Sequence, residues 1–175
     1  MYIRGENIEL RAIERSDYKK LAEILCAPQV AQRLFGQPSK LKEMAFSEWF
    51  SSIAQNRKDF YFTVKETGDF DTVGICAYQD IDYRNGSVTV WVALASEDMD
   101  KDYGSQTLKA LTRNAFDQLR MEYVALYCLE NDSVSEAHAK SAGFSFDALL
   151  YSRIKRGDIR LNLELYNLLK EEVKL

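Results

Sequence analysis

The sequence is poor in the residues that build metal centres and disulfide-rich scaffolds. It contains one histidine, His138, and three cysteines, Cys26, Cys76 and Cys128, which lie far apart within apolar segments. Without a Cys-x-x-Cys pair the spacing argues against a zinc site, and an odd number of separated cysteines argues against a disulfide framework. We therefore expect no metal and three buried thiols in a reducing cytoplasm. A catalytic cysteine stays open as an alternative, although no spacing links one to His138.

Long apolar runs and a strong excess of charge are also lacking. No apolar run approaches the roughly 18–20 residues that span a bilayer, and the first six residues carry charges where a signal peptide needs an apolar segment. The net charge of -4 at pH 7 gives no support for nucleic acid or an anionic membrane as a partner, and it favours an amine-bearing one. The sequence therefore predicts a cytoplasmic protein without a membrane or nucleic-acid partner.

Features that would divide the chain into separate domains are absent from the sequence. There are two prolines, Pro28 and Pro38, and no Gly/Ser-rich tract, internal repeat or low-complexity segment. A chain of 175 residues, of which 46% are hydrophobic, is long enough to bury one core. We expect a single domain over residues 1–175.

The hydrophobic periodicity predicts a mixed α+β fold, in which helices cover the faces of a mixed sheet. Strands are expected at residues 8–13, 60–65, 72–81, 87–94, 123–129, 144–155 and 159–168. Helices are expected from an N-cap at Ser16 through Leu25, and over residues 41–55, 105–119 and 135–142. Residues 28–40 read as irregular. The pair Asn85-Gly86 predicts a hairpin turn, and Gly143 suits the position after a helix C-terminus.

The segment from Met99 to Gly104, which runs into the helical pattern at Ser105, has the position of a phosphate-binding turn. A helix N-terminus presents free N–H groups and a partial positive charge, and glycine lets the backbone come close to an anion. Asp100 and Asp102 bring negative charge to this place instead. A carboxylate about 6 Å from a phosphate opposes binding by roughly 3 kcal/mol at an effective dielectric of about 20, and by less where water screens it. We expect weakened anion binding, with complete loss as the alternative.

Several segments, taken in order, carry a resemblance to a known family. They are Ile8-Glu9-Leu10-Arg11 with the helix after Asp17, Val90-Trp91-Val92-Ala93-Leu94, Gly104-Ser105-Gln106-Thr107-Leu108, Asn131-Asp132-Ser133-Val134-Ser135, Lys140-Ser141-Ala142-Gly143-Phe144 and the turn Arg156-Gly157-Asp158. In this order the chain resembles the GNAT superfamily of N-acetyltransferases over nearly its whole length, and within it the Rim-type branch that acetylates ribosomal-protein N-termini. The resemblance implies a mixed, mostly antiparallel sheet with a splayed central strand pair and helices on both faces.

The resemblance also implies an activity and a co-substrate. It is that of an N-acetyltransferase, which transfers the acetyl group of acetyl-CoA to a primary amine such as a protein N-terminus or a small amine. The residues implied in binding acetyl-CoA are Val92, Ala93, Leu94, Lys101, Tyr103, Gly104, Ser105 and Asn131. The family pattern Arg/Gln-x-x-Gly-x-Gly/Ala falls on Met99, Asp102 and Gly104, so one of its three defined positions is kept and the pyrophosphate loop is degenerate.

The implied catalytic residue is Ser135, eight residues before Gly143, where the ribosomal-protein branch places a serine. Its role would be to protonate the leaving thiolate. Many relatives use a tyrosine for this step, but its position is Ala139 here. The alternative role of Ser135 is a helix N-cap.

Other roles stay open at this stage. Asn131 resembles the cofactor-side asparagine of the family, although strict spacing from Gly143 puts Asp132 in that register. Tyr103 and His138 suit core or surface packing as well as a site. The general base is a water relay, absent, or one of three acids, which are Asp80, Asp82 and Glu164.

Two further hypotheses compete with acetyl transfer. The replacements at Met99, Asp102 and Ala139 are consistent with a non-catalytic module that keeps the fold for binding or assembly. A transferase that uses another acyl-CoA is the third option, since no residue fixes the acyl length. A homodimer is compatible with a splayed sheet.

Overall fold

The chain forms one eight-stranded sheet with helices on both faces. The computed structural model describes residues 2–34, 46–55, 59–68, 71–95 and 101–173. The strands are β1 (Tyr2–Arg4), β2 (Ile8–Ala12), β3 (Phe60–Glu66), β4 (Thr72–Asp82), β5 (Ser87–Leu94), β6 (Tyr123–Leu129), β7 (Ser145–Arg156) and β8 (Ile159–Leu169), in the sheet order β1-β2-β3-β4-β5-β6-β8-β7. The helices are α1 (Tyr18–Cys26), α2 (Pro28–Ala31), α3 (Phe46–Ala54), α4 (Tyr103–Asp117) and α5 (Ser133–Ser141). This confirms the predicted mixed, mostly antiparallel α+β architecture.

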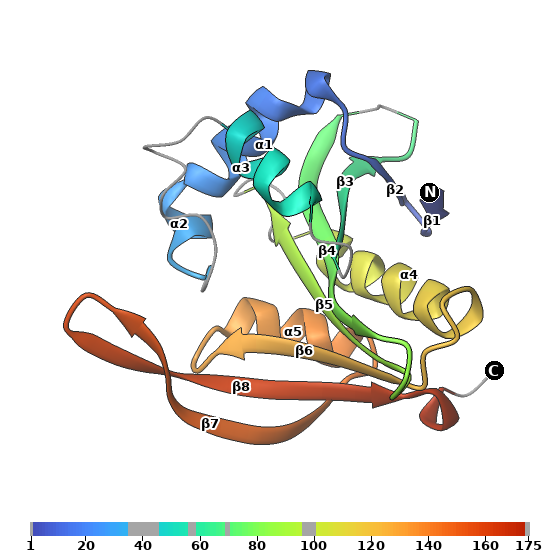
Figure 1. The fold of residues 1–175 in the computed structure, drawn as a ribbon, viewed down its shortest axis with the longest axis vertical. Coiled ribbons are helices and arrows are strands. Elements are labelled where there is room, and N and C mark those ends of the chain that lie inside the picture. The colour runs from blue at the N-terminus through green and yellow to red at the C-terminus, as the bar shows by residue number, and fades with distance from the viewer. Residues whose placement is uncertain (1, 35–45, 56–58, 69–70, 96–100, 174–175) are drawn as a thin grey trace.

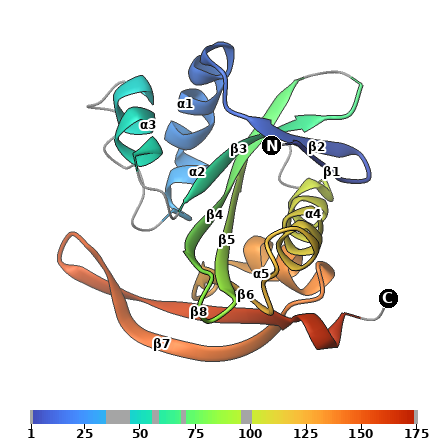
Figure 2. The same cartoon turned by 45° about the vertical axis from the view of Figure 1, so that its right-hand side comes forward.

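The sheet separates two hydrophobic cores. Helices α4 and α5 cover one face and α1, α2 and α3 cover the other (Figure 2). Strand β5 serves both cores because successive side chains point to opposite faces. Val90 packs with Leu108 and Leu111 of α4, whereas Trp91 and Ala93 pack with the residues under α1 to α3.

The centre of the sheet is splayed, as the resemblance implies. Strands β5 and β6 pair in parallel from Ser87–Tyr123 to Val90–Leu126, and the other neighbouring strands pair in antiparallel fashion. Beyond Val90, β5 runs on toward α2 while β6 follows β8 in another direction (Figure 1). The sheet therefore consists of two halves, β1 to β5 and β6 to β8, that are joined over four residue pairs.

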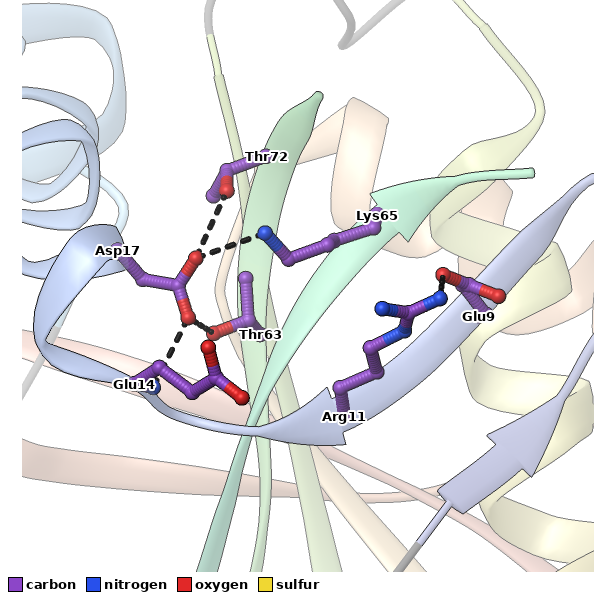
Figure 3. A network of polar contacts seen from close by, with 7 residues as sticks. All are labelled: Glu9, Arg11, Glu14, Asp17, Thr63, Lys65 and Thr72. Carbon is purple, nitrogen blue, oxygen red and sulfur yellow. Dashed lines mark hydrogen bonds and ion pairs between the residues drawn. The ribbon is translucent and has the colours of Figure 1, made fainter. Parts of the chain in front are cut away.

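The start of α1 differs from its prediction. Ser16 is not an N-cap, because residues Arg15–Asp17 form a 3-10 turn and α1 begins at Tyr18. The residue that fixes this turn is Asp17. Its buried carboxylate accepts hydrogen bonds from the backbone N–H of Glu14 at 2.9 Å and from the side chains of Thr63 and Lys65 at 3.0 and 2.8 Å (Figure 3). The carboxylate of Asp17 accepts several hydrogen bonds, whereas the hydroxyl of Ser16 could accept only one or two. The turn before α1 therefore forms around Asp17 and not around Ser16.

Most other elements lie where the sequence predicts them. The seven predicted strands are confirmed within a residue or two, and so are Gly86 in the hairpin turn and Gly143 after α5, both with positive φ. Strand β1 and the four-residue helix α2 were not predicted, since neither is long enough to show a period. The predicted helix over 41–55 is described from Phe46, and the prediction for residues 41–45 lies outside the described residues. Within those residues, no helix is both long and apolar enough to cross a bilayer.

Candidate active site

A cleft opens where β5 and β6 diverge. It contains about 640 Å³ of space, part of which is open to solvent. Its walls come from β5, β6, the α2 segment, α4 and α5, and they consist of Val30, Arg33, Leu34, Trp91, Val92, Ala93, Leu94, Leu108, Leu126, Tyr127, Cys128, Val134, Ser135 and His138. Most of these side chains are apolar, so the cleft suits a ligand with an alkyl chain and a few polar groups.

The cleft passes through the sheet rather than lying on one face. Leu108 and Val134 line it from the side of α4 and α5, and Val30 and Leu34 line it from the side of α1 to α3. The lining of the cleft therefore comes from both sides of the sheet, with β5 between them.

The edge of β5 supplies the polar groups of this passage. Residues 91–94 keep their pairing with β4, from Ala77–Trp91 to Gly74–Leu94, but their pairing with β6 has ended. Backbone N–H and C=O groups that point away from β4 in this stretch face the cleft. They can pair with amide groups of a ligand in the way that an added strand would.

Helix α4 is anchored so that its N-terminus stays beside the cleft. The buried hydroxyl of Tyr78 on β4 donates to the carbonyl oxygen of Leu111 at 2.6 Å, and burial raises its pKa well above the ordinary value, so the donor stays protonated. The hydroxyl of Tyr103 donates to Glu66 at 2.5 Å. Tyr103 thus lies in the hydrophobic core and is not among the residues that line the cleft. This position corresponds to the packing role considered for it from the sequence.

The first turn of α4 carries a negative charge of its own. Ser105 is fully buried, and its hydroxyl donates to the carboxylate of Asp102 and to the backbone oxygen of the same residue. Asp102 is exposed to solvent, and Lys101 is exposed as well, with its Nζ 5.1 Å from the ring centroid of Tyr103. The helix N-terminus, which favours an anion, therefore has a carboxylate held close to it. The predictions for Met99 and Asp100 lie outside the described residues.

Gly104 is explained by a close contact rather than by its own conformation. A Cβ atom at this position would lie 2.5 Å from Cε1 and 2.6 Å from Cγ of His138, and it would also meet Nδ1. The imidazole of α5 is thus packed directly onto the first turn of α4. Because His138 also lines the cleft, it joins the helix N-terminus to the cavity.

Ser135 lines the cleft at the first turn of α5. Its hydroxyl donates to Oδ2 of Asp132 at 2.6 Å, and its backbone N–H donates to Oδ1 at 3.3 Å. Asp132 is therefore the N-cap of the helix, and the alternative that Ser135 is itself the N-cap is wrong. Oδ1 of Asp132 also lies 3.4 Å from Nη1 of Arg33, which lines the cleft from the α2 segment.

Asn131 lies just outside this group of contacts. It is exposed and has a φ of 69°, which places it in a left-handed turn between β6 and α5. The side chain that reaches toward the cleft wall is that of the next residue, Asp132.

The three acids considered as bases lie away from the described cleft lining. Asp80 is exposed at an irregularity of β4, and Asp82 accepts backbone hydrogen bonds from Arg84 and Asn85 in the hairpin turn. Glu164 accepts a hydrogen bond from the hydroxyl of Tyr166 at 3.0 Å. Asp82 and Glu164 thus have hydrogen-bonding partners of their own, and none of the three acids is among the residues that line the cleft.

Cys128 is the thiol of the cleft, and it is poorly suited to act as a nucleophile. Burial raises its pKa to about 12, with a further contribution from the charges of Asp132, Glu164 and Glu136. A thiol with this pKa is almost entirely protonated at neutral pH. Cys76 is buried as well, but Cys26 is half-buried, so the prediction of three buried thiols holds for two of them.

The α2 segment closes the cleft on the face opposite α4 and α5. Arg156, at the tip of the β7–β8 hairpin, donates to the carbonyl oxygens of Gln32 and Leu34, each at 3.0 Å. Together with the contact between Arg33 and Asp132, this ties the segment to one end of the second half of the sheet, where β6 ends and β8 begins. Sequence reasoning missed Arg33, Asp132 as a partner of Ser135, and Arg156. The spacing of Asp132 and Ser135 was visible, but the arginines are about 100 residues or more away from their partners.

Comparisons with known proteins bear on the family and the fold. The family model of the acetyltransferase (GNAT) domain matches residues 7–145. An uncharacterized N-acetyltransferase, p20, of Bacillus licheniformis is 23% identical over 171 residues, which are 95% of each chain. Among solved structures, an acetyltransferase (GNAT family) from Bacillus anthracis superposes with a TM-score of 0.83 at 16% identity and covers 98% of this chain and 99% of its own. The spermidine N-acetyltransferase of Vibrio cholerae in complex with CoA and spermine has a TM-score of 0.83 at 15% identity, over 95% of this chain and 97% of its own.

Proposed function

The chain belongs to the acetyltransferase (GNAT) domain family, and from that premise we propose that it transfers the acetyl group of acetyl-CoA to a primary amine, which is a protein N-terminus or a small amine. Members of this family use acetyl-CoA as their co-substrate, and the similar spermidine N-acetyltransferase is in complex with CoA. The placement in the ribosomal-protein branch is part of the proposal and rests on the spacing of Ser135 and Gly143.

The observation that carries the proposal is the cleft that crosses the sheet. Acyl transfer needs a thioester and an amine that are held together and separated from water. In this chain the face of α4 and α5 offers a helix N-terminus and an apolar wall, and the other face offers the α2 segment. The exposed edge of β5 lies where the two approaches meet.

The residues present can hold acetyl-CoA with one unfavourable element. The backbone of Val92 to Leu94 suits the amide groups of pantetheine, and the amides at Gly104 and Ser105 suit the pyrophosphate. Lys101, exposed just before this turn, adds a positive charge near it. Asp102 opposes the phosphates, so binding is weakened but retained. Tyr103 supports this turn from the core, and Asn131, exposed between β6 and α5, is kept among the binding residues on the resemblance.

When bound, acetyl-CoA supplies an activated acyl group and a thiolate as leaving group. A backbone N–H of β5 near Val92 serves the developing oxyanion, as donors fixed in an apolar site do efficiently. Ser135 is the catalytic residue that gives a proton to the thiolate. The cysteine of the cleft takes no part, because its raised pKa keeps it protonated.

The proposed acceptor is an amine that carries a positive charge when it is free in solution. The net charge of -4 favours such a partner, and the spermidine N-acetyltransferase with the same fold binds spermine in its structure. The proposal therefore includes a polyamine or a peptide N-terminus as the acceptor, a cytoplasmic location, and no nucleic-acid or membrane partner. A homodimer remains part of the proposal on the resemblance alone.

A non-catalytic role is the second candidate, and the carboxylate of Asp102 at the start of α4 is the observation in its favour. Calorimetric titration with acetyl-CoA separates the two. Binding in the micromolar range supports the enzyme. No detectable heat at low salt, for the protein and for the Asp102→Asn variant alike, supports the module.

Turnover is tested by release of free CoA in the presence of spermidine, spermine, a short peptide with a free N-terminus or an amino sugar. We expect release with at least one of them. Ser135→Ala should lower kcat by about 10²-fold or more and leave the dissociation constant of acetyl-CoA within about twofold. Ser133→Ala is the matched control, since Ser133 is exposed on the same first turn of α5 and should change neither value.

A further inference from the structure

The carboxylate of Asp132 forms a continuous set of contacts with Ser135 and Arg33 at the cleft wall. Building on the proposed function, we propose that Asp132 is the positioning residue that orients Ser135. It also holds a proton after the amine has been deprotonated and until the thiolate is protonated. Arg33 fixes Asp132 in place. This supplies the proton acceptor that neither Asp80, Asp82 nor Glu164 provides.

The direction of the hydrogen bond carries the argument. An ionised carboxylate can only accept, so the 2.6 Å contact between Ser135 Oγ and Asp132 Oδ2 has the serine as donor. The proton of Ser135 therefore points at Asp132, and the hydroxyl presents its lone pairs to the cleft. In this orientation Ser135 must take a proton from the cleft before it can give one to a thiolate. Charge-assisted hydrogen bonds of this length are stronger than neutral ones, so the orientation is well held.

The surroundings of Asp132 support a role beyond capping. Its side chain is 8% exposed, which removes the competition of bulk water for its oxygens. Nη1 of Arg33 lies 3.4 Å from Oδ1 and provides the counter-charge, and its side chain is 26% exposed at the cleft. The second oxygen, Oδ2, is left for Ser135. Oδ1 thus contacts Arg33 and the backbone N–H of Ser135, whereas Oδ2 accepts the hydrogen bond from the Ser135 hydroxyl.

The proton transfer balances without any other reactant. The amine nitrogen forms a bond to the acetyl carbonyl carbon and loses a proton to Ser135 Oγ, while the proton of Ser135 passes to Asp132 Oδ2. The C–S bond then breaks with its electron pair on sulfur. Asp132 returns its proton to Ser135, and Ser135 protonates the thiolate. The products are the N-acetylated amine and CoA, and both side chains end as they began.

The variant Asp132→Asn separates this role from capping, because asparagine is as good an N-cap as aspartate but cannot hold the proton. We expect kcat to fall by about 10²-fold or more, and the limb of the pH–rate profile that reports the base to be lost. The dissociation constant of acetyl-CoA and the midpoint of urea unfolding should stay near the wild-type values. Glu136→Gln is the matched control, since Glu136 lies on the same helix and pairs with Lys140. A kcat and pH profile unchanged by Asp132→Asn would overturn the proposal.

A double-mutant cycle tests whether the two residues act as one unit. Asp132→Asn combined with Ser135→Ala should be no slower than Ser135→Ala alone, because the carboxylate acts through the hydroxyl. Losses that multiply would show that Asp132 acts elsewhere. Arg33→Lys should retain more of kcat than Arg33→Met, since the positive charge is what fixes Asp132. Equal kcat values for these two variants would remove Arg33 from the assignment.

A measurement without turnover checks the contact itself. In Ser135→Cys, the negative charge of Asp132 should raise the pKa of the new thiol, and adding Asp132→Asn should lower it by about one unit or more. The pKa is obtained from the pH dependence of alkylation, followed by mass spectrometry of the peptide that contains residue 135. Equal values would exclude the contact. If the wild-type protein neither binds acetyl-CoA nor acetylates any amine, the proposed function falls and this role falls with it. An active enzyme that is indifferent to Asp132→Asn would remove this role alone.

Discussion

Asp102 is the single side chain that most limits the binding of an anion at the start of α4. Its carboxylate accepts a hydrogen bond from the hydroxyl of Ser105, and this contact keeps the charge beside the amides of the first turn. The sequence predicted an unfavourable carboxylate at this place. It could not predict that a buried serine would hold it there, because that depends on the rotamers of both residues.

Replacing Asp102 by asparagine should therefore strengthen cofactor binding. We expect the dissociation constant of acetyl-CoA to fall by roughly tenfold at low salt and by less at moderate salt, as expected for a screened repulsion. Titration calorimetry at two salt concentrations measures this change. Asp117→Asn, at the other end of the same helix and equally exposed, should leave the dissociation constant unchanged. An affinity for acetyl-CoA that is the same in Asp102→Asn and the wild type would show that the carboxylate does not face the phosphates.

Asp17 is a buried charged residue whose loss should destabilise the fold at neutral pH. Burial alone would raise its pKa, but the hydrogen bonds from Lys65, the N–H of Glu14 and Thr63 outweigh burial and hold the pKa below its ordinary value. A lowered pKa in the folded state means that the carboxylate stabilises the fold fully above the unfolded-state pKa, which is about 4. The stabilisation is lost as the pH falls through the lower folded-state pKa.

We expect Asp17→Asn to reduce the free energy of unfolding by about 2–3 kcal/mol at pH 7. The difference from the wild type should shrink below about pH 4. Urea unfolding at pH 7 and at pH 3 measures both values. Asp147→Asn, on the exposed strand β7, serves as the control. A difference that stays constant with pH would contradict the role given to the charge.

At the scale of the elements, the contact between α4 and α5 depends on the absence of a side chain at Gly104. A methyl group there would lie within 2.6 Å of two or more atoms of the His138 ring. Alanine favours a helix interior over glycine by about 1 kcal/mol, but overpacking costs typically about 1–3 kcal/mol. The clash should outweigh the gain in helix propensity, so that the substitution lowers the free energy of unfolding.

We therefore expect Gly104→Ala to lower the free energy of unfolding and to weaken acetyl-CoA binding, because α5 must move away from the first turn of α4. Adding His138→Ala should restore most of the stability, since the second change removes the ring that the methyl group meets. Thermal unfolding and calorimetry of the two single variants and the double variant measure this coupling. Additive losses would show that the two residues do not compete for the same space.

Helices and strands were predicted from the sequence where the segment shows a hydrophobic periodicity within itself. The alternation over Phe60 to Lys65 predicted β3 to within one residue, and the apolar run of Tyr123 to Leu129 predicted β6 with its observed bounds. The same logic failed at Ser16, because a donor network from β3 fixes the start of α1 and no local pattern encodes it. For Ser135, the structural alternative considered from the sequence, a helix N-cap, is wrong. The cap is Asp132, which a reading of Ser135 alone could not show.

For the whole molecule, the separation of the two faces is the main functional feature. The order of the strands and the point at which β5 and β6 part are set by contacts between distant segments, so the residues alone did not predict them. The resemblance to the family implied a splayed central strand pair, but not the order of the strands in the sheet. What neither supplied is the position of the β7–β8 hairpin, whose tip reaches the α2 segment through Arg156.

This contact predicts that the two substrates respond differently to a change at the hairpin tip. Arg156→Ala removes two hydrogen bonds to backbone carbonyls, each worth about 1 kcal/mol or less at a partly exposed site. The KM for the amine should rise by roughly threefold to tenfold, while the dissociation constant of acetyl-CoA stays the same. Steady-state kinetics and calorimetry measure the two quantities. Arg153→Ala, exposed on the same strand, is the control, and an equal effect of Arg156→Ala on both substrates would contradict the separation of faces.

The short junction between the two halves of the sheet has a consequence for the lifetime of the protein. Four residue pairs join β5 to β6. A co-substrate bound beyond them would form hydrogen bonds with the part of the β5 edge that does not pair with β6. A ligand present at about 100 times its dissociation constant stabilises the folded state by roughly 2.7 kcal/mol. Starvation for acetyl donors would therefore leave more of the chain open to proteases, and its abundance in the cell would follow the supply of its own substrate.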